Sequence, residues 1–173
     1  MTDYDAVVYD LDGTLVELDV NWSAVATDVL AVYESADVEP PSSDLWTLLE
    51  EAGEFGLRAP VESTIAEYER DGARTAPRLD RADELLDRRV PVGVCSLNCE
   101  RACRIALTEH DLATAVETVV GRDTVATQKP DPEPLLTAVD ELDASPGRTL
   151  FVGDSRTDEI TADRAGTAFE YVA

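Results

Sequence analysis

Two aspartates near the N-terminus are spaced so that they could address a single site. Asp10 and Asp12 follow the apolar run of residues 6–9, which is typical of a short buried strand, and Gly13 comes directly after them. Side chains two positions apart on extended backbone face the same way, so both carboxylates could point at one ligand. Two like charges this close repel each other unless a cation, a proton or a strong hydrogen-bond donor lies between them. Asp and Gly are also ordinary turn residues, so this pair alone indicates either a turn or a site.

The rest of the chain supplies groups that match this pair. Lys129 is the only lysine among the 14 basic residues, and its ammonium and the hydroxyl of Ser96 suit a phosphoryl group. A carboxylate can also act as a nucleophile and divide a difficult displacement into two easier steps. Hard oxygen ligands that suit Mg²⁺ are offered by four carboxylates: Asp10, Asp12, Asp154 and Asp158. These residue types predict phosphoryl transfer with Mg²⁺ as cofactor.

The elements that must position these groups alternate along the chain. Apolar runs predict strands, and periodic patterns predict helices between them; the strands are expected at residues 6–9, 90–95, 116–120, 149–152 and 169–172. Residues 15–20 alternate apolar and acidic side chains, which predicts a further short strand or hairpin arm. The alternation predicts an α/β fold, a Rossmann-like parallel sheet with helices on both faces. Ligands bind outside the carboxyl ends of such strands, which is where the polar groups fall.

Residues 17–75 interrupt this alternation with helical patterns. Prolines at 40 and 41 end a first helix, Ser42 or Ser43 is expected to cap a second, and Pro60 opens a third. The segment is too small to make a robust independent domain, so it is expected to pack over the strand ends as a helical cap. The predicted division is an α/β core of residues 1–16 and 76–173 with a cap of residues 17–75.

Composition excludes some classes of protein. The net charge of −23, from 37 acidic and 14 basic residues, argues against a nucleic-acid surface, which would need a basic stripe. The acids are scattered through every segment, as in proteins that work in high salt, so we expect a halophilic protein. No apolar run approaches the roughly 18 residues of a membrane span, and no signal peptide is visible, so a cytoplasmic location is expected.

The cysteines and the single histidine add no second site. Cys95, Cys99 and Cys103 are spaced by four, where free cysteines are expected as small buried hydrophobes, and their odd number argues against a disulfide framework. His110 is the only histidine, which argues against a Ser-His-Asp triad or a histidine-rich metal site.

The polar groups together resemble the motifs of the haloacid dehalogenase superfamily of hydrolases, in the branch of phosphoglycolate phosphatases and β-phosphoglucomutases. The insertion between the first two motifs is similar to the small cap of that family. All four motifs occur in the family's order, as Asp10-x-Asp12-Gly-Thr14, Ser96, Lys129-Pro130 and Gly153-Asp154-x-x-x-Asp158.

The resemblance implies a mechanism. Asp10 would attack phosphorus to form an aspartyl-phosphate, and Asp12 would protonate the leaving oxygen and then activate water. Thr14 would help to hold Asp12 and the phosphoryl oxygens. Lys129 would neutralise charge, and Ser96 would donate to a phosphoryl oxygen. The implied Mg²⁺ ligands are Asp10, the Asp12 main-chain carbonyl, Asp154 and, directly or through another group, Asp158.

The chain departs from the family pattern after Ser96, where Leu97-Asn98 replaces the usual Thr-Asn. Asn98 is a candidate substrate-binding residue. Arg58 lies in a predicted loop flanked by Gly and Pro, so it is a candidate for a second anionic group on the substrate. The expected partner is a small phosphorylated metabolite.

Other activities fit part of the pattern. A phosphomutase would use the same core with a different phosphoryl acceptor. A phospho-acceptor signalling module of the receiver type also combines Asp residues, a hydroxyl and a Lys-Pro pair around Mg²⁺, but such modules lack the helical insertion and a further acidic strand end. Dehalogenation is a third possibility, but it needs no acid to protonate an alkoxide leaving group. The family members that perform it lack the second Asp of the first motif, which is present here as Asp12.

Overall fold

The first strand, β1 (Ala6–Tyr9), lies at the centre of a five-stranded sheet. The computed structural model describes residues 3–172, so residues 1, 2 and 173 of the predicted core lie outside the described part. All four neighbouring pairs are parallel, in the order β3-β2-β1-β4-β5. The other strands are β2 (Val92–Cys95), β3 (Thr118–Val120), β4 (Thr149–Gly153) and β5 (Ala168–Tyr171). The expected α/β fold is therefore confirmed.

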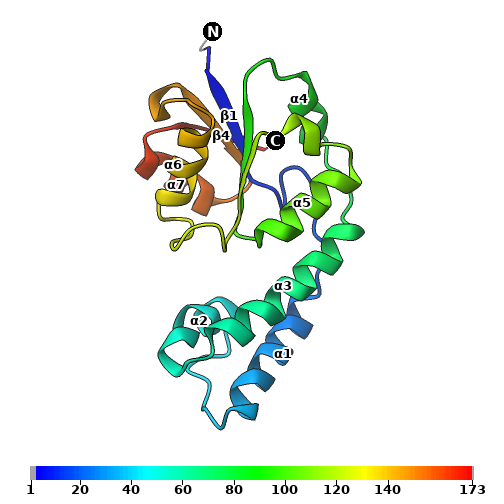
Figure 1. Ribbon diagram of the computed structural model, residues 1–173, viewed down its shortest axis with the longest axis vertical. Coiled ribbons are helices and arrows are strands. Elements are labelled where there is room, and N and C mark those ends of the chain that lie inside the picture. Colours follow the sequence, from blue (N-terminus) through cyan, green and yellow to red (C-terminus); the bar gives the residue numbers. More distant parts are fainter. Residues whose placement is uncertain (1–2, 173) are drawn as a thin grey trace.

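Helices cover both faces of this sheet, which explains why β1, β2 and β4 are buried and largely apolar, whereas the edge strand β5 carries Glu170 and is partly exposed. Val7 and Tyr9 point to one face, where they pack with α4 (Arg81–Asp87) and α5 (Glu100–Glu109). Ala6 and Val8 point to the other face, toward α6 (Glu133–Glu141) and α7 (Arg156–Ala165). Figure 1 shows these two helical layers on opposite sides of β1 and β4. Two single 3₁₀ turns complete this part, at Ala113–Ala115 and Pro146–Arg148.

The segment after β1 folds into a separate helical layer beyond the end of the sheet (Figure 1). It comprises α1 (Trp22–Ser35), α2 (Leu45–Glu51), the 3₁₀ helix η1 (Ala52–Phe55) and α3 (Arg58–Arg74). These helices share a hydrophobic cluster of their own, whose fully buried members include Val25, Val29, Tyr33, Leu48, Leu49, Val61 and Ile65. The C-terminal part of α3 also packs against α5 of the core.

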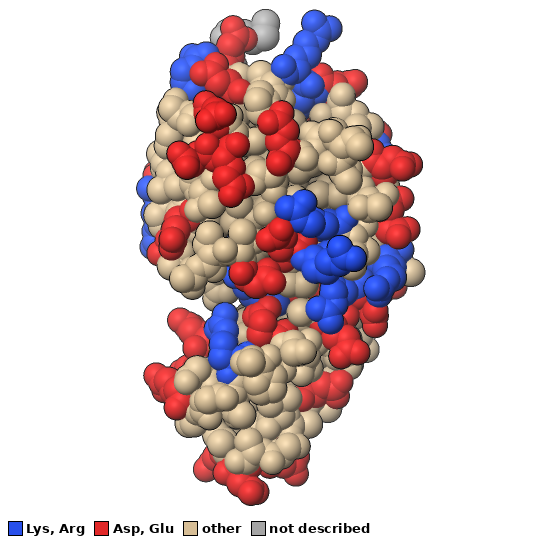
Figure 2. All heavy atoms as spheres, viewed as in Figure 1, with Lys and Arg blue, Asp and Glu red and all other residues tan. Residues whose placement is uncertain are grey.

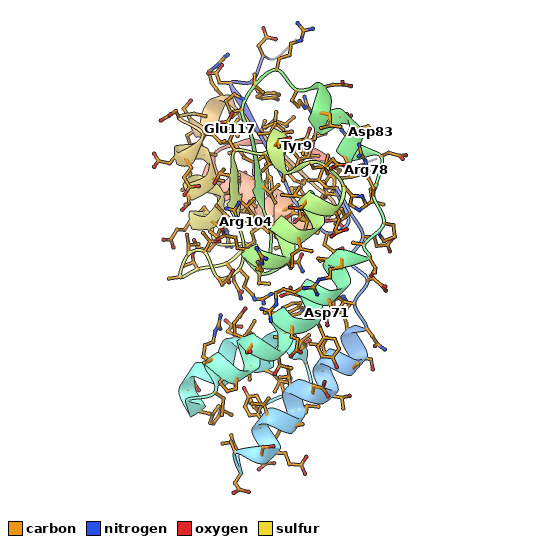
Figure 3. All side chains as sticks on the ribbon, turned by 45° about the vertical axis from the view of Figure 1, so that its right-hand side comes forward. Tyr9, Asp71, Arg78, Asp83, Arg104 and Glu117 are labelled. Carbon is orange, nitrogen blue, oxygen red and sulfur yellow. The ribbon has the colours of Figure 1, made fainter. Side chains whose placement is uncertain are left out.

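Two chain segments cross side by side where this helical layer joins the core. Val16 and Arg78 form an antiparallel bridge, and Leu79 N–H donates to the Leu15 carbonyl at 2.9 Å. Gly72 at the end of α3 lies so close that a Cβ there would be 2.5 Å from the Asp19 carbonyl oxygen. Arg78 also forms an ion pair with Asp83 at α4, and both side chains can be followed in Figure 3. The junction is therefore fixed by backbone contacts on both segments.

Some local expectations differ from the structure. The prediction of a strand or hairpin arm at residues 15–20 is wrong. Val16 makes only isolated bridges, to Asp12 and to Arg78, because this segment pairs with the chain that crosses it at the junction and does not extend into a strand. The cap of α2 is Asp44, whose carboxylate accepts from Thr47 N–H at 3.0 Å, and Ser42 instead accepts from Asp44 N–H. Aspartate caps a helix as well as serine does, and Asp44 is the residue directly before Leu45, where α2 begins.

The helix α3 begins two residues before the proline that was expected to open it. Arg58 is the first residue of this helix and not part of a loop. Proline is tolerated in the first turn because the N–H it lacks would have no partner inside the helix. The helix α7 begins at Arg156, directly after a capping box in which the Ser155 side chain accepts from Asp158 N–H.

The three cysteines are buried and unpaired, as expected. Within residues 3–172, no helix has both the length and the apolar character needed to cross a bilayer.

Candidate active site

Polar side chains from four parts of the core meet at the carboxyl ends of the strands. Asp10 follows β1 and Asp154 follows β4, the neighbouring strands between which the strand order reverses. Ser96 follows β2, and Lys129 comes from the loop after β3. They surround a cleft of about 280 Å³ lined by Asp10, Asp12, Trp22, Trp46, Leu97, Asn98, Lys129, Asp154, Ser155 and Asp158.

Lys129 occupies the floor of this cleft. Its Nζ atom donates to Asp10 Oδ1 at 3.1 Å, to Asp158 Oδ1 at 2.6 Å and to the Cys95 carbonyl at 3.2 Å. Burial would lower the pKa of Lys129, but the charges of Asp10 and Asp158 outweigh burial and raise its pKa above the usual value. The only lysine of the chain is therefore held as an ammonium ion between two carboxylates.

Asp10 presents one of its two oxygens to these donors. Its Oδ1 accepts from Lys129 and from Leu11 N–H at 2.8 Å, and no described residue donates to Oδ2. Burial raises the pKa of Asp10, and the Lys129 ammonium opposes that effect. Because Oδ2 has no donor, it is the oxygen available to a metal or to an electrophile.

Asp12 stands beside Asp10 in a different environment. Its Oδ1 accepts from Leu18 N–H at 2.9 Å, which fixes the side chain over the first turn of the junction. Burial raises the pKa of Asp12, and the nearby charge of Asp154 raises it further. A raised pKa suits a carboxyl group that must deliver a proton. Two carboxylates two residues apart are thus assigned different surroundings by the fold.

Three carboxylates are close enough to hold a cation. Single oxygens of Asp10, Asp154 and Asp158 all lie within 4.8 Å of one another. The Asp158 oxygens are already engaged, Oδ1 with Lys129 and Oδ2 with the Ser155 hydroxyl at 2.9 Å. The carboxylate of Asp12 is not part of this group, although it was predicted with the metal ligands.

Glycine is required where Asp154 approaches the first motif. Gly13 has φ +80°, and a Cβ there would lie 2.1 Å from Asp154 Oδ2. The Gly13 turn therefore makes the space that brings the Asp154 carboxylate to Asp10. Oxygen-only donors in this cradle fit a hard divalent cation such as Mg²⁺.

Ser96 and Thr14 are buried beside the cleft. The Ser96 hydroxyl donates to Asn98 Oδ1 at 3.0 Å and accepts from Asn98 N–H at the same distance, which stabilises the turn after β2. The Thr14 hydroxyl has no partner among the described residues. A buried hydroxyl without a partner is costly, and the role of Thr14 as a donor to a bound group stays a prediction.

A buried ion pair that sequence reasoning missed fixes this turn to the helical layer. Asn98 Nδ2 donates to Glu69 Oε2 of α3 at 2.8 Å. Arg122, from the loop after β3, donates to both oxygens of Glu69 at 2.7 and 2.9 Å and to the Leu97 carbonyl at 2.8 Å. Arg122 also contacts Glu62, at 2.6 Å. One signal was available, because Glu69 falls on the apolar stripe of α3, an unusual place for an acid unless it is paired.

The structure does not bring Arg58 to the cleft lining. Its Nη1 donates to the Leu49 carbonyl at 3.0 Å, within the helical layer, so its role in binding a second anionic group stays a prediction. Trp22 and Trp46 were missed as lining residues. They are the only two tryptophans of the chain, and both stand at the beginning of a helix in the insertion.

Known proteins share this arrangement. A family model described as haloacid dehalogenase-like hydrolase matches residues 77–172. A phosphoglycolate phosphatase of Rhodospirillum rubrum is 34% identical over 183 residues, covering 93% of this chain and 76% of that protein. The pyrophosphatase PpaX of Oceanobacillus iheyensis is 26% identical, covering 96% of this chain and 82% of that protein. The structure of a haloacid dehalogenase superfamily hydrolase from Geobacter sulfurreducens superposes with a TM-score of 0.65 at 26% identity, covering 96% of this chain and 88% of that one.

The family model covers the second half of the chain, whereas the two relatives and the solved structure match nearly all of it, and the shared fold agrees with the parallel sheet described above. The resemblance expected from the sequence is confirmed, and the chain belongs to the haloacid dehalogenase-like hydrolase family.

Proposed function

We propose that this protein is a Mg²⁺-dependent phosphatase that hydrolyses a small phosphate monoester through an aspartyl-phosphate on Asp10. The observation that carries the proposal is the position of Asp10 in the cleft, where Lys129 holds its Oδ1 at 3.1 Å and Oδ2 has no donor among the described residues. The names of the relatives, phosphoglycolate phosphatase and pyrophosphatase, support phosphate ester or anhydride hydrolysis.

The residues of the cleft divide the reaction between them. Asp10 attacks phosphorus, and Lys129 balances the charge of the nucleophile and of the phosphoryl oxygens. Asp12, whose pKa is raised by burial and by the charge of Asp154, is proposed to act as the general acid that gives a proton to the leaving oxygen. The same carboxylate then takes a proton from the water that hydrolyses the aspartyl-phosphate. Thr14 and Ser96 are proposed as donors to phosphoryl oxygens, since the buried Thr14 hydroxyl has no partner among the described residues and Ser96 follows β2 at the carboxyl edge of the sheet.

The proposed metal ligands are Asp10, Asp154 and the Asp12 main-chain carbonyl. Bound Mg²⁺ supplies positive charge that lets a phosphate dianion approach these carboxylates. Asp158 is proposed to act indirectly, because it holds Lys129 at 2.6 Å and accepts from Ser155.

The helical layer is proposed as the cap of the enzyme, with residues 17–75 as the cap and residues 1–16 and 76–173 as the catalytic core. Its own hydrophobic cluster and its contribution of Trp22 and Trp46 to the cleft support this division. Acidic side chains are scattered over both parts of the face in Figure 2, between uncharged and basic ones, and together with the net charge of −23 they support a halophilic protein. The buried free thiols support a cytoplasmic location.

A single assay tests the reaction. The protein is incubated with a panel of phosphate monoesters and Mg²⁺ in molar KCl, with EDTA and Asp10→Asn as controls. Multiple turnovers that both controls abolish are expected. Phosphoryl transfer to a second sugar phosphate in place of water would identify a phosphomutase. A single stoichiometric phosphorylation by acetyl phosphate without turnover would identify a receiver-like module, and activity that survives Asp10→Asn would refute the mechanism.

A further inference from the structure

Two tryptophans form the wall of the cleft opposite the catalytic carboxylates. Trp22 is the first residue of α1, and Trp46 is the second residue of α2. Their ring centroids are 5.6 Å apart and the ring planes meet at 54°, so the rings contact each other at an angle and leave no slot between them. Both rings line the cleft together with Asp10 and Lys129. The insertion thus presents an aromatic corner, Trp22 and Trp46, to the reaction site.

Packing of the insertion accounts for part of Trp22 but not for Trp46: Trp22 is half-buried against the hydrophobic cluster of the insertion, whereas Trp46 is not among the residues packed there. The helix α2 buries Leu45, Leu48 and Leu49 in the cluster shared with α1 and α3. Trp46 is outside that set of buried residues and is 42% exposed, which leaves a large apolar ring in contact with the cleft and with solvent. The chain has only two tryptophans, and both are at this position, although the rest of the insertion could be covered by aliphatic side chains.

The charges around the cleft restrict what can lie against the aromatic corner. Lys129 is the only cation among the described lining residues, and it is already paired with Asp10 and Asp158. Arg122 lies behind Asn98, but its side chain has no exposed surface and its guanidinium is shared between Glu62 and Glu69. With the proposed Mg²⁺ serving the phosphoryl group, a second anionic group on the substrate would find carboxylates but no free cation among the described lining residues. Burying an unpaired charge in such surroundings is strongly unfavourable.

We propose that Trp22 and Trp46 bind the leaving group of the substrate, and that this leaving group carries an uncharged planar ring. The inference rests on the proposed phosphatase activity and adds the class of substrate to it. Rings pack against tryptophan by stacking or edge-to-face contacts, which require no charge on the ligand. A leaving group with a carboxylate, such as that of phosphoglycolate, gains nothing from this wall.

The tryptophans themselves report on binding. They are the only two in the chain and both line the cleft, so intrinsic fluorescence follows its occupancy directly. The probes are three phosphonates, which phosphatases do not hydrolyse, titrated with Mg²⁺ present. Phenylphosphonate carries a ring, methylphosphonate a methyl group and phosphonoacetate a carboxylate. Phenylphosphonate is expected to bind about tenfold more tightly than methylphosphonate, because stacking on one aromatic side chain strengthens binding by about this factor. Phosphonoacetate is expected to bind no better than methylphosphonate.

Two variants separate a binding role from a structural one. Trp46→Ala keeps Trp22 as reporter and is expected to weaken phenylphosphonate about tenfold while changing methylphosphonate less than twofold. Phe55→Ala is the matched control, because Phe55 is 41% exposed in the same insertion but does not line the cleft. This control is expected to leave the Kd of every phosphonate within twofold of the wild-type value.

Tighter binding of phosphonoacetate than of phenylphosphonate by the wild type would overturn the inference. Equal weakening of phenylphosphonate and methylphosphonate in Trp46→Ala would overturn it too, since the tryptophan would then only support the fold of the cleft. Turnover of the phosphate monoester panel is measured separately. Its absence for every ester would refute the proposed phosphatase, whereas the phosphonate titrations decide the ring preference whether or not turnover is seen.

Discussion

Replacing Arg122 by methionine should destabilise the protein because it leaves the charge of Glu69 buried. Both side chains of the pair have no exposed surface, and Arg122 donates to both Glu69 oxygens. After the change, Glu69 keeps only neutral donors, Asn98 Nδ2 at 2.8 Å and Cys99 N–H at 3.3 Å. Breaking a buried pair costs about 3–5 kcal/mol of the free energy of unfolding. Because two donors to Glu69 remain, we expect a loss at the lower end of this range, about 3 kcal/mol. For a chain of this size that lowers the melting temperature by about 6–12 °C.

A double-mutant cycle tests this reasoning. Glu69→Gln combined with Arg122→Met removes both charges and keeps an acceptor for Asn98, so it is expected to recover most of the loss. Unfolding is measured with urea in molar KCl, because guanidinium chloride would change the ionic strength. Arg104→Met is the matched control: Arg104 pairs with Glu100 on the surface of α5, with side chains 52% and 32% exposed, and should cost less than about 1 kcal/mol. An Arg122→Met variant as stable as this control, or a double variant no more stable than Arg122→Met, would show that α3 does not depend on this pair.

Three further predictions test other parts of the structure. Gly13→Ala should abolish Mg²⁺-dependent turnover, because the new Cβ would meet Asp154; Gly56→Ala, which also replaces a residue at positive φ (+71°) but has open space around it, should cost only about 1 kcal/mol and keep activity. Burial raises the pKa of Cys95 to about 12 and that of Cys99 to about 11. As the pH rises, the unfolded chain therefore loses its thiol protons first, near pH 8.5. The free energy of unfolding should fall from there toward pH 11, and it should fall less steeply in Cys99→Ala. With a net charge of −23, the melting temperature should fall from molar to millimolar KCl, and an unchanged value would refute the halophilic expectation.

The sheet and the strand-end residues could be predicted because their signals are local. Each core strand is a short apolar run, and Asp10, Ser96 and Asp154 stand directly after such runs, where the rule for parallel sheets places ligands. Lys129 could be identified because it is the only lysine of the chain. Its two carboxylate partners, however, were known only when the coordinates gave the distances.

The features that were missed depend on contacts between distant segments. Glu69 and Arg122 are far apart in sequence, and neither residue indicates its partner without the packing of α3 on the core. The place of Trp22 and Trp46 follows from how α1 and α2 pack together, which periodicity within each helix does not determine. Arg58 was assigned to a loop because the neighbouring Gly and Pro dominated the local pattern, although Pro60 is compatible with a first helical turn.

The central place of β1 in the sheet has a consequence for how the chain folds. This strand is made first, yet its neighbours β2 and β4 begin only at Val92 and Thr149. The helices of the insertion come between β1 and β2 and have a hydrophobic cluster made of neighbouring segments. Contacts between nearby residues form faster than pairing between distant ones, because less loop entropy is lost. During synthesis, the insertion can therefore condense first, and Asp10 meets Asp154 and Asp158 only after β4 has been made.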